Sequence, residues 1–85
     1  IFMSYCVYML KCISSVKKRT YVGYTKNLNT RLKNHNSNKG AKYTKGNIWK
    51  VIFVKKFLTK SKAMSYEYQL KNDRSKRNKI YNNYK

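Results

Sequence analysis

Residues 5–25 have the sequence YCVYMLKCISSVKKRTYVGYT. The first part, Tyr5–Leu10, is a short apolar run and predicts a strand that is covered on both faces. The last part, Thr20–Thr25, is rich in β-branched and aromatic residues and predicts a second strand. The connection between them is short and carries the polar turn Lys17–Arg19, so the two strands are expected to form an antiparallel hairpin.

The chain after this hairpin predicts a helix, a loop and a third strand. The helix runs from about Leu28 to His35, with Asn27 as its N-cap. A polar loop follows as far as Gly46. Trp49–Phe57 has a central apolar run and predicts the third strand.

The last part of the chain predicts a second helix and a basic end. Thr59 or Ser61 caps the helix, which runs to about Lys71. Residues 74–85 form a basic tail or a third short helix. The order β-β-α-β-α with an optional final helix predicts one α/β (α+β) domain over residues 1–85, a small three-stranded antiparallel sheet flanked by helices.

The net charge indicates the kind of partner. The 85 residues include 21 Lys and Arg but only two acidic residues, which gives a net charge of +19. A charge of this size predicts an anionic partner, and nucleic acid fits best. A membrane fits less well, because no stretch is long and apolar enough to span a bilayer. The residues expected to contact nucleic acid are Lys26, Lys42, Lys45, Arg74, Lys76 and Arg77.

The two cysteines favour a reducing compartment inside a cell. Cys6 and Cys12 lie in one predicted strand, where their Cα atoms would be roughly 20 Å apart, too far for a disulfide. Two cysteines and one histidine are also too few for a structural zinc site. Unpaired thiols are typical of reducing surroundings, so the cytoplasm, a nucleus or a viral replication site would suit this chain.

One of the two acidic residues, Glu67, stands in an apolar pattern. A helix that contains it would have one apolar face with the spacing i, i+3, i+4, i+7, and this face is expected to be buried. A carboxylate is costly there, and on a basic protein it is suited to holding a metal ion against a phosphate. An ion pair with Lys71 at i+4 is the competing interpretation. The apolar pattern consists of Ala63, Tyr66, Glu67 and Leu70.

Four further side chains are candidates to act with Glu67. Arg31 and His35 are spaced i, i+4 and so share one helix face. Tyr8 and Tyr21 lie on the two hairpin strands and would project from one face of the sheet. Each has a plainer interpretation as a core aromatic, a solvated cation or a helix-terminal histidine. Together, however, they would supply a base, a proton carrier and a phosphate clamp.

These segments resemble the GIY-YIG nuclease superfamily. The pair Cys6–Tyr8 and Tyr21–Gly23 is similar to its paired motif, although Cys6 stands where the motif has its first glycine. Residues 29–36, NTRLKNHN, look like its arginine-containing helix, and residues 63–68, AMSYEY, look like its metal-binding glutamate helix. The matches occur in order over residues 5–73. Within the superfamily the chain is most similar to the SLX-type catalytic subunit and to small single-domain bacterial proteins.

The resemblance implies a metal-dependent, structure-specific DNA endonuclease. SLX-type enzymes cut branched DNA such as Holliday junctions and flaps, during repair or recombination. In this chain Glu67 would hold Mg²⁺ or Mn²⁺, and Tyr8 would take a proton from the attacking water. Tyr21 would position the water or the phosphate, Arg31 would pair with phosphate oxygens, and His35 would tune Tyr8 or assist protonation. Many members also carry a late asparagine near the site, for which Asn78 and Asn82 are the candidates.

Two other functions fit the same composition. One is a non-catalytic nucleic-acid-binding module of the same fold, and the other is a basic packaging or ribosome-associated protein. A homodimer or a regulatory partner protein would suit an enzyme that makes paired cuts, but the sequence has no interface signature. We expect selection by DNA shape, because no element carries a base-reading pattern.

Overall fold

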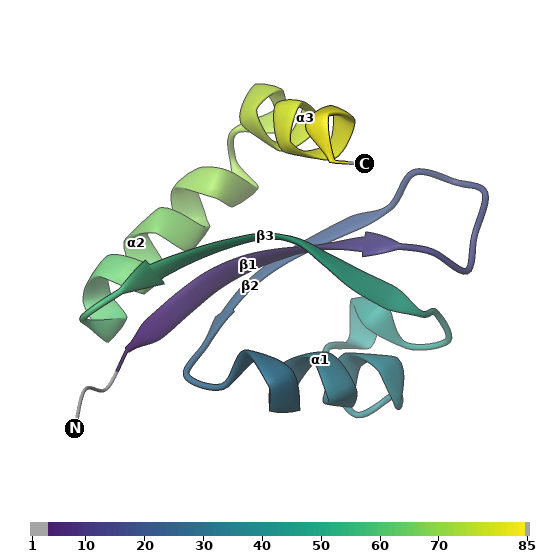
Figure 1. Cartoon of the computed structure of the whole chain (residues 1–85), viewed down its shortest axis with the longest axis horizontal. Coiled ribbons are helices and arrows are strands. Elements are labelled where there is room, and N and C mark those ends of the chain that lie inside the picture. Colours follow the sequence, from purple (N-terminus) through teal and green to yellow (C-terminus); the bar gives the residue numbers. More distant parts are fainter. Residues whose placement is uncertain (1–3, 85) are drawn as a thin grey trace.

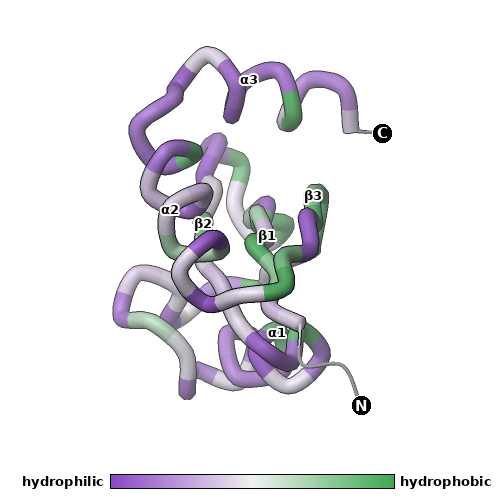
Figure 2. Tube along the Cα trace, turned by 90° about the vertical axis from the view of Figure 1, so that its left-hand side faces the viewer, coloured by the Kyte–Doolittle hydropathy of each residue, from purple (hydrophilic) through white to green (hydrophobic). Residues whose placement is uncertain are grey.

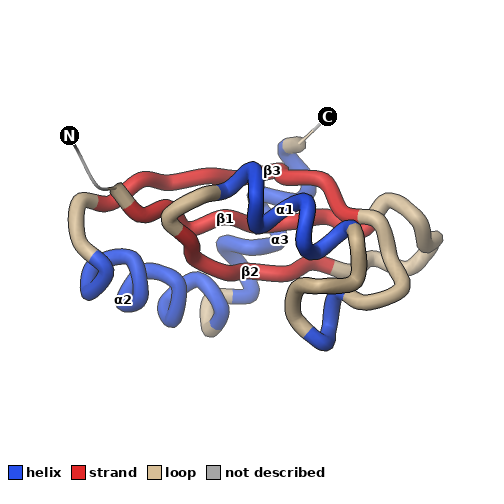
Figure 3. Tube along the Cα trace, turned by 90° about the horizontal axis from the view of Figure 1, so that it is seen from below, coloured by secondary structure: helices blue, strands red, loops and turns tan. Residues whose placement is uncertain are grey.

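The computed structural model of the chain describes residues 4–84 as a three-stranded antiparallel sheet with helices on both faces (Figure 1). The strand order is β2-β1-β3, so β1 lies in the centre and β2 forms an edge (Figure 3). The expected fold class is confirmed, and the basic end forms a helix. The elements are β1 (Tyr5–Cys12), β2 (Thr20–Thr25), α1 (Leu28–Asn36), the 3₁₀ helix η1 (Lys42–Thr44), β3 (Trp49–Phe57), α2 (Lys60–Lys71) and α3 (Arg74–Asn83).

The central strand β1 has two buried faces, as its apolar run predicts. Successive side chains of a strand point to opposite faces. Val7 and Met9 therefore face α2, where they pack with Ala63 and Leu70. The alternate residues face α1 on the other side of the sheet. These are Tyr8, Leu10 and Cys12, which pack with Trp49 and with the partly buried Tyr21, Leu28, Leu32 and Val51.

The helices begin where short polar side chains cap them. The Asn27 side chain accepts a hydrogen bond from the Thr30 amide at 3.1 Å and starts α1. Thr59, rather than Ser61, caps α2. The second acidic residue, Asp73, caps α3 by accepting from the Lys76 amide at 3.0 Å. Side-chain caps satisfy amide groups that a helix leaves free at its first turn.

The main difference from expectation lies in the loop before β3. This loop contains the 3₁₀ helix η1, which was not predicted, because a three-residue turn has no hydrophobic period to detect. Side-chain hydrogen bonds hold it in place. The Thr44 hydroxyl donates to the Ala41 carbonyl at 2.8 Å, and the Trp49 ring nitrogen donates to the Thr44 carbonyl at 3.0 Å. Trp49 itself is buried at 2% exposure and belongs to the core.

Two further expectations can be compared with the structure. Cys6 and Cys12 are both buried free thiols, as expected. Among residues 4–84, no helix has the length and apolar character needed to cross a bilayer.

Candidate active site

Tyr8 lies at the centre of the candidate site and is fully buried. Its hydroxyl lies 2.9 Å from Nε2 of His35, and it accepts a longer hydrogen bond, 3.4 Å, from Nε of Arg31. Gly23 pairs with Tyr8 across the β1–β2 register. A Cβ atom at position 23 would lie 2.6 Å from the Tyr8 hydroxyl oxygen, so glycine is required there to make room for the phenol.

The hydrogen bonds of His35 fix the direction in which a proton can move. Its Nδ1 lies 2.8 Å from the hydroxyl oxygen of Thr44, and both residues are fully buried. The single hydroxyl proton of Thr44 is donated to the Ala41 carbonyl, so this hydroxyl accepts from Nδ1–H. In the neutral imidazole the other nitrogen is then unprotonated. Nε2 therefore accepts from the Tyr8 hydroxyl.

The surroundings keep both Tyr8 and His35 uncharged at neutral pH. Burial raises the pKa of Tyr8 to about 12, although the hydrogen bond from Arg31 acts in the opposite direction. Burial and then the positive charge of Arg31 lower the pKa of His35. The hydrogen bond to Tyr8 raises the pKa of Arg31, which therefore stays charged. A protonated phenol next to a free imidazole nitrogen is the arrangement that a proton relay needs.

Tyr21 lies beside this relay and reaches the surface. Its ring centre is 4.9 Å from that of His35 and 6.3 Å from that of Tyr8, so the four predicted residues of the α1 face come together. On its other side Tyr21 stacks with Tyr43, with ring centres 6.2 Å apart. Neither Tyr43 nor Thr44 was predicted as a site residue, since both lie in the loop that showed no periodic pattern.

Glu67 lies on α2, which packs against the face of the sheet opposite to that of Tyr8. Ala63 and Leu70 of its helix face are buried, as predicted, whereas the Glu67 side chain keeps 18% of its surface exposed. Its carboxylate lies 3.4 Å from Nζ of Lys71, the ion pair of the competing interpretation. Within residues 4–84 it makes no hydrogen bond to Tyr8, Arg31 or His35.

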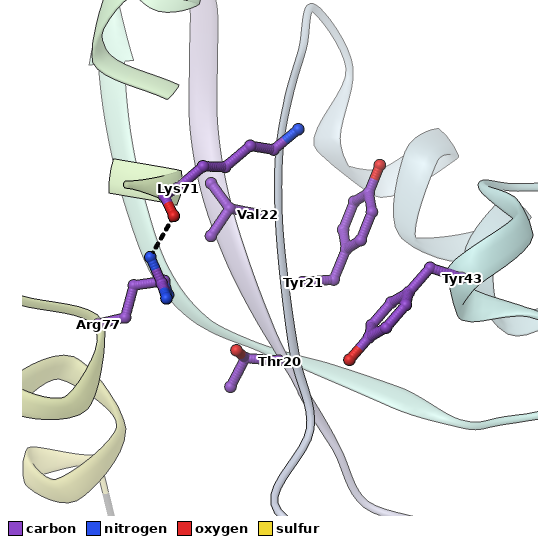
Figure 4. A pocket seen from close by; sticks show the side chains of 6 residues that line it. All are labelled: Thr20, Tyr21, Val22, Tyr43, Lys71 and Arg77. Carbon is purple, nitrogen blue, oxygen red and sulfur yellow. Dashed lines mark hydrogen bonds between the residues drawn. The ribbon is translucent and has the colours of Figure 1, made fainter. Parts of the chain in front are cut away.

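A hollow of about 240 Å³ connects the two sides of β2. Figure 4 shows the strand passing between Lys71 and Arg77 on one side and Tyr21 and Tyr43 on the other. The hollow thus extends from Tyr21, which lies beside Tyr8 and His35, to Lys71, the ion-pair partner of Glu67. Its lining residues are Thr20, Tyr21, Val22, Tyr43, Lys71 and Arg77.

The residues around Glu67 suit a weakly held, hydrated divalent ion. No group of three or more His, Cys, Asp or Glu side chains capable of holding a metal occurs in residues 4–84. Mg²⁺ keeps several waters and commonly binds through one or two carboxylates and substrate phosphates. The ammonium group of Lys71 already lies beside Glu67, and because its side chain is 49% exposed a metal ion can displace it. The single carboxylate of Glu67 then suits a hydrated divalent ion of this kind.

The residues predicted to contact nucleic acid are spread over the molecule. Lys42 and Lys45 lie in and after η1, and Lys26 precedes α1 with its ammonium 5.3 Å from the Tyr5 ring. The remaining three, Arg74, Lys76 and Arg77, lie on α3. Of the two late asparagines, Asn78 accepts from Lys18 at 2.8 Å, away from the tyrosine relay, and Asn82 is exposed at the end of α3.

Comparisons with known proteins show which family the chain resembles. Residues 4–82 match the model of the GIY-YIG catalytic domain. The chain is 48% identical over 66 residues to the UPF0213 protein OB0043 of Oceanobacillus iheyensis, covering 76% of this chain and 73% of the relative. It is 41% identical over 75 residues to the UPF0213 protein YazA of Bacillus subtilis, covering 87% of this chain and 73% of the relative.

A solved structure has a similar fold. The solution NMR structure of the UPF0213 protein BH0048 from Bacillus halodurans has 35% sequence identity and a TM-score of 0.55, and the match covers 94% of this chain and 84% of that chain. These relatives are bacterial proteins, in agreement with the resemblance to small single-domain bacterial proteins seen in the sequence. They give no support to a nucleus or a viral replication site.

Proposed function

The chain belongs to the family of GIY-YIG catalytic domains, and on this basis we propose that it is a metal-dependent endonuclease that hydrolyses phosphodiester bonds in DNA. The observation that carries the proposal is the hydrogen-bonded series from Thr44 through His35 to Tyr8. A domain that only binds nucleic acid has no need of a buried phenol aligned with an unprotonated imidazole nitrogen. The net charge of +19 supports a polyanionic substrate.

Tyr8 and His35 would remove the proton from the attacking water. The water gives its proton to the Tyr8 oxygen while the Tyr8 proton moves to Nε2 of His35. The Nδ1–H group remains bonded to Thr44, which keeps the ring oriented as it becomes charged. Arg31 donates to the same phenolic oxygen and stabilises negative charge that develops on it.

Access to Tyr8 would depend on Arg31. Tyr8 has no exposed surface, so water reaches its oxygen only when a neighbour moves. Arg31 is partly exposed and holds Tyr8 by a long bond of 3.4 Å. A phosphate is a better partner for a guanidinium, because it accepts two parallel hydrogen bonds. Substrate binding would therefore draw Arg31 outward and uncover the base only when DNA is present.

The remaining site residues would hold the substrate at the edge of β2. Tyr21, which lines the hollow, would position the water or the scissile phosphate. Glu67 would hold Mg²⁺ or Mn²⁺ after displacing Lys71 from its carboxylate. When bound there, the ion would supply positive charge that stabilises the phosphate as negative charge builds up on it.

The DNA structure that is cut belongs to the same proposal. Resemblance to the SLX-type branch supports branched DNA, such as Holliday junctions or flaps, in repair or recombination. The helices present basic side chains rather than a row of base-reading groups, which supports selection by shape. Paired cuts in a junction would suit a homodimer or a regulatory partner. The buried free thiols Cys6 and Cys12 support a reducing compartment inside the cell.

A non-catalytic nucleic-acid-binding module is the second candidate. The observation that favours it is the ion pair between Glu67 and Lys71, which gives the carboxylate a structural partner. Such pairs on a helix surface contribute only about 0.3–0.5 kcal/mol, so this pair alone does not account for the carboxylate.

One experiment separates these two functions. A labelled four-way junction, a flap and a matched linear duplex are incubated with Mg²⁺, with Mn²⁺ or with a chelator, in parallel with a Glu67→Gln variant. An endonuclease cuts with a divalent ion and loses this activity in Glu67→Gln, which still binds DNA. Tight binding without cutting under any metal would establish the binding module instead.

A further inference from the structure

A second hollow lies next to the one beside Tyr21. The second hollow, of about 210 Å³, lies between the β1–β2 hairpin and α3. Thr20 and Arg77 line both hollows, so the two are neighbours. We call the two hollows together the β2–α3 trough. The second hollow is lined by Met9, Lys18, Thr20, Arg74, Arg77 and Asn78.

The second hollow concentrates positive charge without a compensating acid. Three of its lining residues are Lys18, Arg74 and Arg77, and no carboxylate lines either hollow. Asp73 precedes Arg74 in the chain, but its carboxylate accepts from the Lys76 amide as the cap of α3. The trace of α3 is hydrophilic along most of its length (Figure 2). Like charges brought together repel one another unless an anion binds between them.

Two of these cations are held in place before any ligand arrives. Lys18 donates to the Asn78 side chain at 2.8 Å, and its ammonium lies 4.6 Å from the centre of the Tyr81 ring. Arg77 donates through Nη1 to the carbonyls of Leu70, at 2.9 Å, and Lys71. Both bonds of Arg77 come from one nitrogen, so Nε and Nη2 remain for a ligand. Fixed side chains lose less entropy on binding than free ones.

We propose that the second hollow binds the backbone phosphate next to the scissile phosphate and so leads the DNA strand across the edge of β2 onto α3. This inference rests on the proposed function, since it takes the scissile phosphate to lie at Arg31 and Tyr21. The sugar between the two phosphates lies in the first hollow. This hollow is smaller than the roughly 300 Å³ of pockets for larger ligands, and the rings of Tyr21 and Tyr43 line it beside the cations Lys71 and Arg77.

The test removes one charge from the protein and one from the DNA. A series of flap DNAs is made, each with a single uncharged methylphosphonate linkage at a different position around the branch. Binding of each DNA is measured by fluorescence anisotropy in the presence of a chelator. Arg74→Ala is compared with Lys79→Ala, which removes an exposed charge from the same helix outside the trough. The Arg74 side chain is exposed and makes no hydrogen bond or ion pair within residues 4–84, so we expect Arg74→Ala to keep the fold, which a thermal melt checks.

The expected result is coupling at one linkage position. There, the uncharged linkage weakens binding to the unmodified protein and to Lys79→Ala by about threefold or more. The same linkage does not weaken DNA binding by Arg74→Ala any further. The salt dependence of Arg74→Ala should also fall by about 0.7–0.9 in log–log slope, the value for one lost phosphate contact.

Independent effects would overturn the proposal. If the linkage and Arg74→Ala weaken binding by separate factors at every position, the second hollow holds no phosphate. Because binding is measured without a divalent ion, these outcomes do not depend on cleavage. Coupling in a protein that never cuts DNA would leave this phosphate site standing and contradict the endonuclease alone.

Discussion

The hydroxyl of Tyr8 lies 2.9 Å from Nε2 of His35, although the two residues are 27 positions apart in the chain. Both are fully buried, and Thr44 continues the series on the far side of the imidazole. In the part of the chain that the structure describes, no buried side-chain nitrogen or oxygen lacks a partner. Low local polarity strengthens the hydrogen bonds of such a network. A buried polar group that lacks a partner lowers the free energy of unfolding by about 1–3 kcal/mol. The α1 side of the core is therefore organised around a polar relay.

Replacing Thr44 with valine should reduce cleavage without abolishing DNA binding. The valine has nearly the same shape but cannot accept from Nδ1 of His35, so the imidazole loses its fixed orientation. A positioned base contributes about 10²- to 10⁴-fold to a reaction, and we expect kcat to fall roughly tenfold or more. Single-turnover cleavage together with anisotropy binding measures both effects.

The matched variants for this change are Thr44→Ser and Thr30→Val. Serine keeps the hydroxyl and should retain most of the activity. Thr30 is exposed on α1, so its replacement should have little effect. Equal activity of Thr44→Val and the unmodified protein would mean that His35 does not act through its Nδ1 contact.

Tyr8 should make the protein less stable at high pH. Its pKa is about 12 in the folded protein but about 10 in an unfolded chain, so the unfolded chain releases this proton first. Stability contributed by Tyr8 is therefore present below about pH 10 and is lost as the pH rises toward about 12. Lysines also lose charge in this range, so the comparison is with Tyr8→Phe, which lacks the titrating group.

Urea unfolding of both proteins at two pH values measures this effect. Between about pH 9 and pH 11, the unmodified protein should lose about 1 kcal/mol of unfolding free energy relative to Tyr8→Phe. A difference between the two proteins that does not change with pH would show that the phenol is not held protonated by its surroundings.

The fold could be predicted because its signals are local. The alternating and apolar runs of β1 and β2, and the caps Asn27 and Thr59, act within a few residues of the chain. The 3₁₀ helix η1 was missed because it depends on contacts with Trp49 and His35, which no local pattern records. The end of the chain was left open between a tail and a helix, and the Asp73 cap accounts for the helix.

Only part of the candidate site could be predicted from the sequence. Residue type and spacing singled out Tyr8, Tyr21, Arg31 and His35, and the structure brings these four together. Sequence spacing could not show that Tyr8 is fully buried, since nine tyrosines share the chain and any of them could fill a core. The relation of Glu67 to the others depends on how α2 packs beside β2, which is a tertiary property.

Replacing Gly23 with alanine should damage the relay as well as the fold. The added methyl group would lie 2.6 Å from the Tyr8 oxygen and 2.9 Å from the carbon that carries it. Overpacking of this kind costs about 1–3 kcal/mol. In a Tyr8→Phe background the closest contact is absent, so the cost should be smaller. Chemical unfolding of the two single variants and the double variant gives the coupling, and strictly additive costs would contradict the close approach.

Replacing Lys71 with methionine should strengthen binding of a divalent ion. The Lys71 ammonium lies 3.4 Å from the Glu67 carboxylate, so a metal ion must displace it. Exposed ion pairs contribute about 0.2–1 kcal/mol, which corresponds to a Kd for Mn²⁺ that is lower by roughly 1.4- to fivefold. Electron paramagnetic resonance of free Mn²⁺, recorded without DNA, measures this Kd directly.

Two control variants make this result specific to Glu67. Lys62→Met removes an exposed charge from the same helix at a distance from the ion pair and should leave Mn²⁺ affinity unchanged. Glu67→Gln should lose the site, alone or combined with Lys71→Met. If Lys71→Met and Glu67→Gln both bind Mn²⁺ like the unmodified protein, the ion is held elsewhere. The carboxylate would then have only the structural partner seen here, which would favour the binding module over the endonuclease.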